Sequence, residues 1–306
     1  MTKQLATAVG CLLLANMIWA GNALLARYAS SGDLQPITMN FLRWSIGALV
    51  LLPFCVKTIY QHRGIWLKWD VFKKLLSLAI LGMVIYNSLL YASAHHTTAI
   101  NIALLNTCIP LATFMAAGIL MGQWPKAASW LGLSIAASGL LYLISRGNIE
   151  ALVQLQFNQG DLWMLVAVVA WSVYTVLLKI WAGKLGLPPL AMLNVMMCLA
   201  VILMLPLAGW EVAQLGLPSW NATNLGILAY IGIMASIVSY VAWNYGVGQV
   251  GPAKASLALY TMPVFSSILS YVLLGESLQH YHWVGGGIIV SGLLLASALG
   301  QVPKNK

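Results

Sequence analysis

The chain is built from apolar segments that follow one another with short polar links between them. Ten such segments cover about residues 6–26, 37–56, 74–94, 98–121, 127–145, 161–181, 189–208, 223–246, 253–275 and 281–299. A helix needs about 20 mostly apolar residues to cross a bilayer, and each segment has about that length. Only 7% of the residues are charged, whereas a soluble domain carries about 25%. The sequence therefore predicts an all-α membrane protein with ten transmembrane helices.

Lysine and arginine are distributed unevenly over the links. With the N-terminus in the cytoplasm, twelve basic residues fall on the inner side and two, Arg27 and Arg146, on the outer side. Because cytoplasmic links carry an excess of basic residues, we expect both termini in the cytoplasm. The first apolar run is longer than the roughly 7–15 residues of a secretory signal and predicts an uncleaved span. The net charge of +9 belongs to these links, so no nucleic-acid partner is predicted.

The second half of the chain repeats the pattern of the first. Matching positions lie 152 or 153 residues apart: Trp19 and Trp171, Pro36 and Pro188, Pro110 and Pro263, Gly122 and Gly275, and Gly139 and Gly292. Each unit, about 1–150 and 151–306, holds five spans, and an odd number of spans turns the second unit upside down. We therefore predict two inverted five-helix repeats, an architecture of secondary transporters that bind substrate at the repeat interface. A duplicated scaffold or channel is the alternative.

Two motifs resemble a known family. The segment NYGVGQVGPAKASLALYTMPVFSSILSYVLLGE at 244–276 and NFLRW at 40–44, together with the five-plus-five spans, resemble the EamA branch of the drug/metabolite transporter superfamily. The resemblance covers about residues 7–299. It implies a bacterial inner (plasma) membrane exporter of small metabolites, with the YddG-type amino-acid exporters as structural relatives. The motifs say little about the substrate.

Two spans carry a proline near their middle, Pro110 and Pro263. A proline inside a helix removes a hydrogen bond and kinks the helix, and in lipid the freed carbonyl needs a partner or a wet cavity. A static kink and a hinge beside a cavity are both compatible with this placement. Polar residues share the proline's face in each span: Ser256, Tyr260, Ser267 and Ser270 in the second repeat, and Asn106 and Thr113 in the first. The serines are typical of interhelical packing, whereas Asn106 and Tyr260 are the better candidates for substrate contact.

The thirteen tryptophans divide by depth. Ten, Trp44 among them, fall near span ends or in links and fit the aromatic belt at a membrane surface. Trp19 and Trp171 lie deeper, and core packing and the lining of a central pathway are equally supported for them. The remaining candidates for the pathway are polar or aromatic residues inside spans: Asn22, Tyr86, Asn87, Tyr91, Tyr174, Ser239, Trp243 and Asn244.

Arg43 is the only full charge well inside a span. Such a residue is costly in lipid and is a functional candidate by default. It can also snorkel to the surface or support the fold, and we favour the structural role. Asp161 and Glu276, expected at the outer ends of their spans, are the candidate partners.

Small residues form stripes on the last span of each repeat, at Gly132, Ala136 and Gly139 in the first and at Gly285, Gly286, Gly287 and Gly292 in the second. Such stripes permit close helix contact, either within one chain or in a homodimer.

The four cysteines lack zinc-site spacing, and no HExxH, GxSxG or phosphate-binding glycine loop occurs. The sequence therefore predicts no metal, no cofactor and no enzyme.

The leading hypothesis is a secondary transporter that exports amino acids, their analogues or small drugs by alternating access across the lipid bilayer. A central cavity edged by tryptophan, tyrosine and asparagine suits such substrates, including weak cations through cation–π contact. A membrane channel or facilitator is one alternative. A phosphorylated-metabolite carrier is another, but it would require clustered arginine or lysine.

Overall fold

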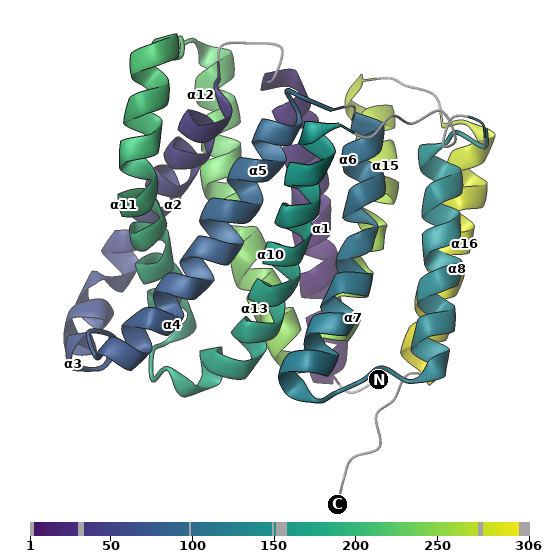
Figure 1. Ribbon diagram of the computed structural model, residues 1–306, viewed down its shortest axis with the longest axis horizontal. Coiled ribbons are helices and arrows are strands. Elements are labelled where there is room, and N and C mark those ends of the chain that lie inside the picture. The colour runs from purple at the N-terminus through teal and green to yellow at the C-terminus, as the bar shows by residue number, and fades with distance from the viewer. Residues whose placement is uncertain are drawn as a thin grey trace, which may run out of the picture.

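The computed structural model describes residues 3–29, 34–97, 99–148, 150, 158–274 and 278–299. Within these ranges every regular element is a helix, which confirms the all-helical prediction for this part of the chain. The helices stand side by side in one bundle, and α1 begins at the same end of the bundle at which α16 finishes (Figure 1). The first half contains α1 (Lys3–Ala29), α2 (Pro36–Gln61), α3 (Arg63–Trp66), α4 (Trp69–Ala79), α5 (Tyr86–Ser93), α6 (Ala99–Asn106), α7 (Cys108–Met121) and α8 (Ala127–Ile144). The second half contains α10 (Gln159–Trp181), α11 (Pro189–Leu215), α12 (Ala222–Ala229), α13 (Ser239–Val250), α14 (Pro252–Leu257), α15 (Met262–Leu274) and α16 (His280–Leu299).

Eight helical stretches in the described residues are long and apolar enough to cross a membrane: Lys3–Asn22, Pro36–Gln61, Trp69–Ser93, Asn101–Met121, Ala127–Ile144, Gln159–Lys184, Pro189–Leu215 and Ala222–Val250. The last two predicted spans coincide with α14–α15 and with α16. Several helices extend beyond their predicted ends. With 27 residues, α11 is about 40 Å long, which matches a bilayer with its headgroups rather than the hydrocarbon core alone. Hydropathy marks only the hydrocarbon core, and this explains why the predicted spans are shorter than the observed helices.

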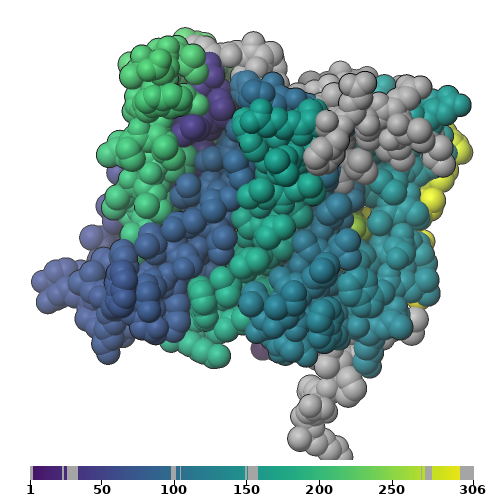
Figure 2. Space-filling model, viewed as in Figure 1, coloured from purple at the N-terminus to yellow at the C-terminus, as the bar shows by residue number. Residues whose placement is uncertain are grey.

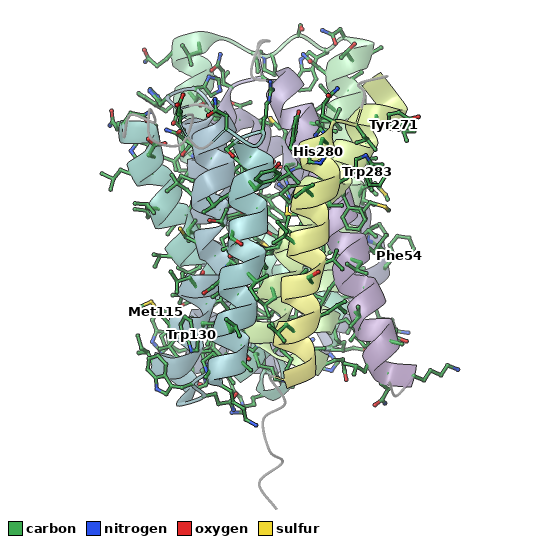
Figure 3. All side chains as sticks on the ribbon, turned by 90° about the vertical axis from the view of Figure 1, so that its right-hand side faces the viewer. Phe54, Met115, Trp130, Tyr271, His280 and Trp283 are labelled. Atoms are coloured by element: carbon green, nitrogen blue, oxygen red, sulfur yellow. The ribbon has the colours of Figure 1, made fainter. Side chains whose placement is uncertain are left out.

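The outside of the bundle is apolar. Figure 2 shows a closely packed surface from which the chain around α3 projects at the lower end. Phe54 and Trp283 lie on the outside of the helices (Figure 3) and are 78% and 69% exposed. Soluble monomers rarely expose contiguous apolar patches beyond a few hundred Å². This surface therefore faces lipid.

Four interruptions break the regular α-helices. A π-helix at Ile80–Ile85 separates α4 from α5, and a second at Tyr230–Val238 separates α12 from α13. The chain also makes a turn at Thr107 between α6 and α7, and a 3-10 segment at Ala258–Thr261 joins α14 to α15. The two π-helices lie about 153 residues apart in the sequence, and so do the turn and the 3-10 segment.

Each mid-span proline lies directly after an interruption of a helical path that continues on both sides of it. Pro110 is the third residue of α7 and Pro263 is the second residue of α15. Helical residues precede each proline, at Ala99–Asn106 and at Pro252–Thr261. Because a proline has no N–H to bond the carbonyl group four residues earlier, the regular hydrogen bonding is interrupted just ahead of each proline.

The small-residue stripes of α8 and α16 pack against each other within the chain. A methyl group added at Gly292 would lie 2.7 Å from the carbonyl oxygen of Gly132 and closer still to the amide nitrogen of Ala136. A methyl group at Gly139 would lie 2.7 Å from Ile288. The backbones of α8 and α16 are thus in contact. Gly287 of the predicted stripe takes no part in this contact, because a methyl group there meets no atom within 4 Å.

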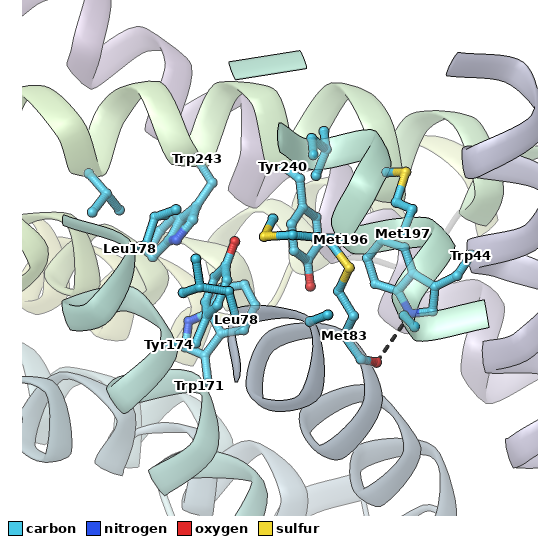
Figure 4. Packing of buried hydrophobic residues seen from close by; sticks show 14 of the residues in the cluster. Trp44, Leu78, Met83, Trp171, Tyr174, Leu178, Met196, Met197, Tyr240 and Trp243 are labelled. Atoms are coloured by element: carbon cyan, nitrogen blue, oxygen red, sulfur yellow. Dashed lines mark hydrogen bonds between the residues drawn. The ribbon is translucent and has the colours of Figure 1, made fainter. Parts of the chain in front are cut away.

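The main core lies between α1, α2, α4, α5, α10, α11 and α13. It is rich in methionine and aromatic side chains, several of which appear together in Figure 4. Trp44 belongs to this core and is 0% exposed, with its indole N–H donating to the carbonyl oxygen of Met83 at 3.1 Å. Its assignment to the membrane-surface belt is wrong, because distance along the sequence from a span end does not show which face of the helix carries the ring.

Candidate functional site

Six aromatic rings meet in the middle of the bundle, and we refer to them as the aromatic cluster: Trp19, Tyr86, Trp171, Tyr174, Tyr240 and Trp243. They come from α1, α5, α10 and α13. The ring centroids of Trp19 and Trp171 are 5.3 Å apart, those of Trp19 and Trp243 are 5.4 Å apart, and those of Trp171 and Trp243 are 5.7 Å apart. Tyr86 lies against Trp171 at 4.7 Å. Edge-to-face and tilted contacts of this kind are favourable for aromatic pairs.

Arg43 lies beside this cluster and is 1% exposed. Its Nε donates to Ser236 Oγ at 2.7 Å and its Nη2 to the carbonyl oxygen of Ala235 at 2.9 Å. Its Nη1 donates to Asn87 Oδ1 at 2.9 Å and to Tyr91 Oη at 2.8 Å. The guanidinium thus joins α2 to α5 and to the π-helix Tyr230–Val238, entirely through neutral oxygen atoms.

Of the two predicted carboxylate partners, Asp161 does not contact Arg43. Asp161 accepts hydrogen bonds from Thr97, Asn101 and Asn158 at the start of α10. Glu276 lies outside the described residues. Asp161 completes a capping box with Asn158, because a carboxylate in the first turn pairs with free backbone N–H groups there. The snorkelling alternative is also excluded for Arg43, since its side chain is enclosed by protein.

The two π-helices supply backbone acceptors to the site. The carbonyl oxygen of Gly82 accepts from Tyr240 Oη at 2.7 Å and from Asn87 Nδ2 at 3.0 Å. That of Ala235 accepts from Trp19 Nε1 at 3.1 Å in addition to Arg43. Widening a helix turn changes which carbonyl groups have a partner in the same helix. In this protein the acceptors are occupied by Tyr240, Trp19 and Arg43 from other helices and by Asn87 from the same span.

Two tyrosine–asparagine hydrogen bonds flank the aromatic cluster. Tyr91 Oη donates to Asn22 Oδ1 at 3.4 Å, between α5 and α1. Tyr174 Oη donates to Asn244 Oδ1 at 3.1 Å, between α10 and α13. Asn22 and Tyr174 are 152 residues apart, and Tyr91 and Asn244 are 153 residues apart. Equivalent positions in the two halves therefore form the same bond with the residue types exchanged.

These two bonds lie toward opposite ends of the bundle. Asn22 is one helical turn beyond Trp19 along α1, and Tyr174 is one turn beyond Trp171 along α10. Figure 1 shows α1 rising and α10 descending through the bundle. The aromatic cluster is consequently bordered above and below by the same kind of contact.

Several buried polar atoms of the site have no hydrogen-bond partner among the described residues. They include the indole nitrogens of Trp171 and Trp243 and the side-chain oxygen atoms of Asn16 and Asn106. More than 90% of buried polar groups in proteins are paired, so each exception requires an explanation. Asn106, a predicted contact residue, is among them.

The other predicted polar residues contribute structure. Ser256 and Ser267, which were expected to pack between helices, donate to carbonyl groups of their own helical segments. Ser239, a predicted pathway residue, donates to the carbonyl oxygen of Met234 at 3.1 Å. The side chain of Ser270 lies outside the described residues. Tyr260 Oη donates to the carbonyl oxygen of Thr107 at 2.7 Å and thereby links the two helix breaks beside Pro110 and Pro263.

The sequence prediction missed Tyr240, which touches Trp19, Trp44 and Trp171. A signal was present, because Tyr240 stands 153 residues after Asn87, a predicted site residue. Asn87 Nδ2 donates to Tyr240 Oη at 3.4 Å. Comparing the two halves position by position would have identified the pair.

Comparisons with known proteins agree with the repeat. The model of the EamA-like transporter family matches twice, at residues 6–145 and 158–298. The chain is similar to the uncharacterized transporter YyaM of Bacillus subtilis, with 27% identity over 92% of this chain and 90% of that protein. It is 25% identical to the uncharacterized inner membrane transporter YedA of Escherichia coli K12, over 96% of this chain and 92% of that protein. A crystal structure with 19% identity superposes with a TM-score of 0.74 over 96% of this chain and 98% of that one, which shows a shared fold.

Proposed function

The chain belongs to the EamA-like transporter family, and from this premise we propose that it exports small metabolites by alternating access. It is a multi-pass membrane transporter. Its proposed substrates are amino acids, their analogues or small drugs, and its proposed location is the bacterial inner membrane. The two halves, 1–150 and 151–306, act in this proposal as inverted five-helix repeats with ten spans in all.

Contacts between equivalent positions support the inverted repeat. Trp19 touches Trp171 at a sequence spacing of 152, and Asn87 bonds Tyr240 at a spacing of 153. Residues related by a two-fold axis touch only where they lie close to that axis. The aromatic cluster therefore occupies the proposed repeat interface, where secondary transporters bind their substrates.

The observation that carries the transport proposal is the pair of tyrosine–asparagine bonds around this cluster. Alternating access requires a central site that can be closed on either side. Asn22–Tyr91 and Tyr174–Asn244 are equivalent contacts between different helices on opposite sides of the aromatic rings. Breaking one bond while keeping the other would open the centre to one side only.

Charge supports a cytoplasmic location for both termini. The chain around α3 carries the basic residues Lys57, Arg63, Lys68, Lys73 and Lys74. It lies at the end of the bundle where α1 begins and α16 finishes (Figure 1). Cytoplasmic links attract such an excess of positive charge.

The proposal is tested by counterflow into proteoliposomes, starting with radiolabelled L-phenylalanine and a panel of other amino acids and cationic drugs. A carrier accumulates label transiently and saturably against unlabelled substrate, whereas an open pore lets label equilibrate without saturation. Absence of counterflow for every compound of the panel would reject the proposed substrate range. Cells that overproduce the chain should tolerate toxic analogues of the transported compound, and increased sensitivity would contradict export.

A matched pair of variants tests the role of the flanking bonds. Tyr174→Phe removes the hydroxyl that bonds Asn244 and should change the counterflow rate several-fold. Tyr271→Phe removes a hydroxyl from an exposed ring on α15 and should leave the rate unchanged. Equal rates in both variants and the native protein would argue against a closing role for the Tyr174 bond.

The site gives little support to a phosphorylated substrate. Within the described ranges Arg43 is the only lysine or arginine that is buried, and four protein oxygen atoms already accept its hydrogen bonds. Recognition of phosphate would require several cationic donors that converge on the ligand.

A further inference from the structure

Two indole N–H groups in the aromatic cluster are buried without any hydrogen-bond acceptor. Trp171 is 2% exposed and Trp243 is 0% exposed, and neither Nε1 atom has a partner in the described part of the chain. Trp19 and Trp44 are also buried, at 7% and 0% exposed, but each indole donates to a backbone carbonyl. The lack of a partner is therefore specific to two of the four central tryptophans.

An indole nitrogen is a donor only, so an oxygen or another acceptor is the only partner that can satisfy it. Unpaired donors in a protein interior are destabilising and rare. The rings of Trp171 and Trp243 contact each other at 5.7 Å with an angle of 42° between their planes (Figure 4). The two unpaired donors thus belong to neighbouring side chains on facing helices, α10 and α13.

The electrostatics of the centre favour a negatively charged acceptor. Among the described residues no carboxylate contacts the buried Arg43, and Asn87 joins Arg43 to Tyr240, whose ring lies 5.8 Å from that of Trp171. The buried carboxylates in the described residues are Asp161 and Glu211. Asp161 accepts a backbone hydrogen bond at the start of α10, and Glu211 of α11 accepts one at the start of α2. Neither belongs to the aromatic cluster.

We propose that Trp171 and Trp243 form a carboxylate-binding subsite, in which the transported molecule accepts one hydrogen bond from each indole N–H. The molecule's apolar part contacts the remaining rings of the aromatic cluster. This inference rests on the proposed transport function and specifies its substrate class: small, partly apolar carboxylates are preferred, and amines without a carboxylate bind at least ten-fold more weakly. In the ligand-free protein the rings contact one another, and binding separates them.

The first experiment compares probes that share one scaffold. Purified full-length protein in lipid nanodiscs is titrated with 3-phenylpropionate, 3-phenylpropanamide and 3-phenylpropylamine, with binding followed by calorimetry. The carboxylate is expected to bind at least ten-fold more tightly than the amine, with the amide in between. Equal affinities, or tighter binding of the amine, would overturn the proposal.

The second experiment removes the N–H groups without changing ring size. Site-specific replacement of Trp171 and Trp243 by 3-benzothienylalanine substitutes a sulfur atom for the indole N–H. Affinity for 3-phenylpropionate should fall about ten-fold or more, while affinity for 3-phenylpropylamine stays within two-fold. Because an unpaired buried donor is destabilising, the apparent Tm of the ligand-free protein should rise by about 2–4 °C.

The same replacement at Trp19 is the matched control, since its N–H donates to Ala235. There the ligand-free Tm should fall. A fall in Tm on replacing Trp171 and Trp243 would show that these N–H groups already have structural partners and would refute the subsite. The binding and stability results stand apart from the counterflow assay: failure of counterflow alone rejects transport of the tested compounds, whereas unchanged carboxylate affinity rejects the subsite.

Discussion

Glycine at 292 is the position where the packing of the last two repeat helices can be tested most directly. In Gly292→Ala the new methyl group would lie 2.7 Å from the carbonyl oxygen of Gly132 and 2.9 Å from Cα of Ala136. Both atoms belong to the backbone of α8, so no side-chain rotation relieves the contact and the two helices must separate. On the same helix, a methyl group at Gly287 meets no atom within 4 Å. Gly287→Ala is therefore the matched control.

The two substitutions should have opposite effects on stability. Overpacking of a close interface costs about 1–3 kcal/mol, whereas alanine is favoured over glycine in a helix by about 0.5–1 kcal/mol. The net result is a loss of about 1–2 kcal/mol for Gly292→Ala and a gain of up to about 1 kcal/mol for Gly287→Ala. At about 2–4 °C per kcal/mol, the apparent Tm values of the variants should differ by several degrees.

Thermal unfolding of the purified proteins in one detergent, followed by intrinsic fluorescence, measures the difference. The reasoning is refuted if both variants shift the Tm in the same direction by the same amount. Ala136→Gly provides a second check. It should not rescue Gly292→Ala, because the contact at residue 136 involves main-chain atoms. A change of oligomeric state in Gly292→Ala would instead indicate that the stripe serves a homodimer.

Three further substitutions test the buried polar contacts. Arg43→Gln should reduce stability by about 2–4 kcal/mol, because buried acceptors on two other helical segments lose a charged donor. Immunoblots of membranes should then show several-fold less protein. Abundant but inactive protein would contradict this structural role. Glu211→Ala should cost about 1–2 kcal/mol in thermal unfolding, because its carboxylate accepts from the backbone N–H and the hydroxyl of Thr38 in the first turn of α2; an unchanged Tm would show that water replaces the cap. Tyr260→Phe should cost about 1 kcal/mol through loss of the bond to Thr107, measured in the same way, and a larger loss would point to a packing change.

Sequence reasoning worked best where one physical effect dominates. The cost of polar surface in lipid fixes the positions of the apolar helices, and nine of the ten predicted starts lie within three residues of a described helix start. The exception is the third span, which begins at Trp69 instead of 74 because polar residues of the membrane surface continue the helix. Helix type was not predictable. The π-helix at Ile80–Ile85 carries ordinary apolar residues, and its widened turn depends on hydrogen bonds from other helices.

The candidate site was predictable only to the extent that the repeat reveals it. The repeat paired Trp19 with Trp171, and Asn22, Tyr91 and Asn244 were among the predicted pathway residues. Their hydrogen bonds were not predicted, since they depend on which helix faces are turned toward each other. The residues 152 and 153 positions after Arg43 are the apolar Val195 and Met196, so its four neutral partners had no counterpart from which they could be inferred.

The proposed two-fold relation explains why the most informative pair was also the hardest to recognise. A side chain near the axis meets its own equivalent, and a hydrogen bond between the two requires one donor and one acceptor. Asn87 and Tyr240 satisfy this requirement with different residue types at a spacing of 153, whereas searches for repeats reward identical residues. Polar positions that differ between the halves are therefore the better guide to the centre of this molecule. The same reasoning assigns Trp19 and Trp171 unequal roles, because the indole of Trp19 is paired with Ala235 and that of Trp171 is left for a ligand.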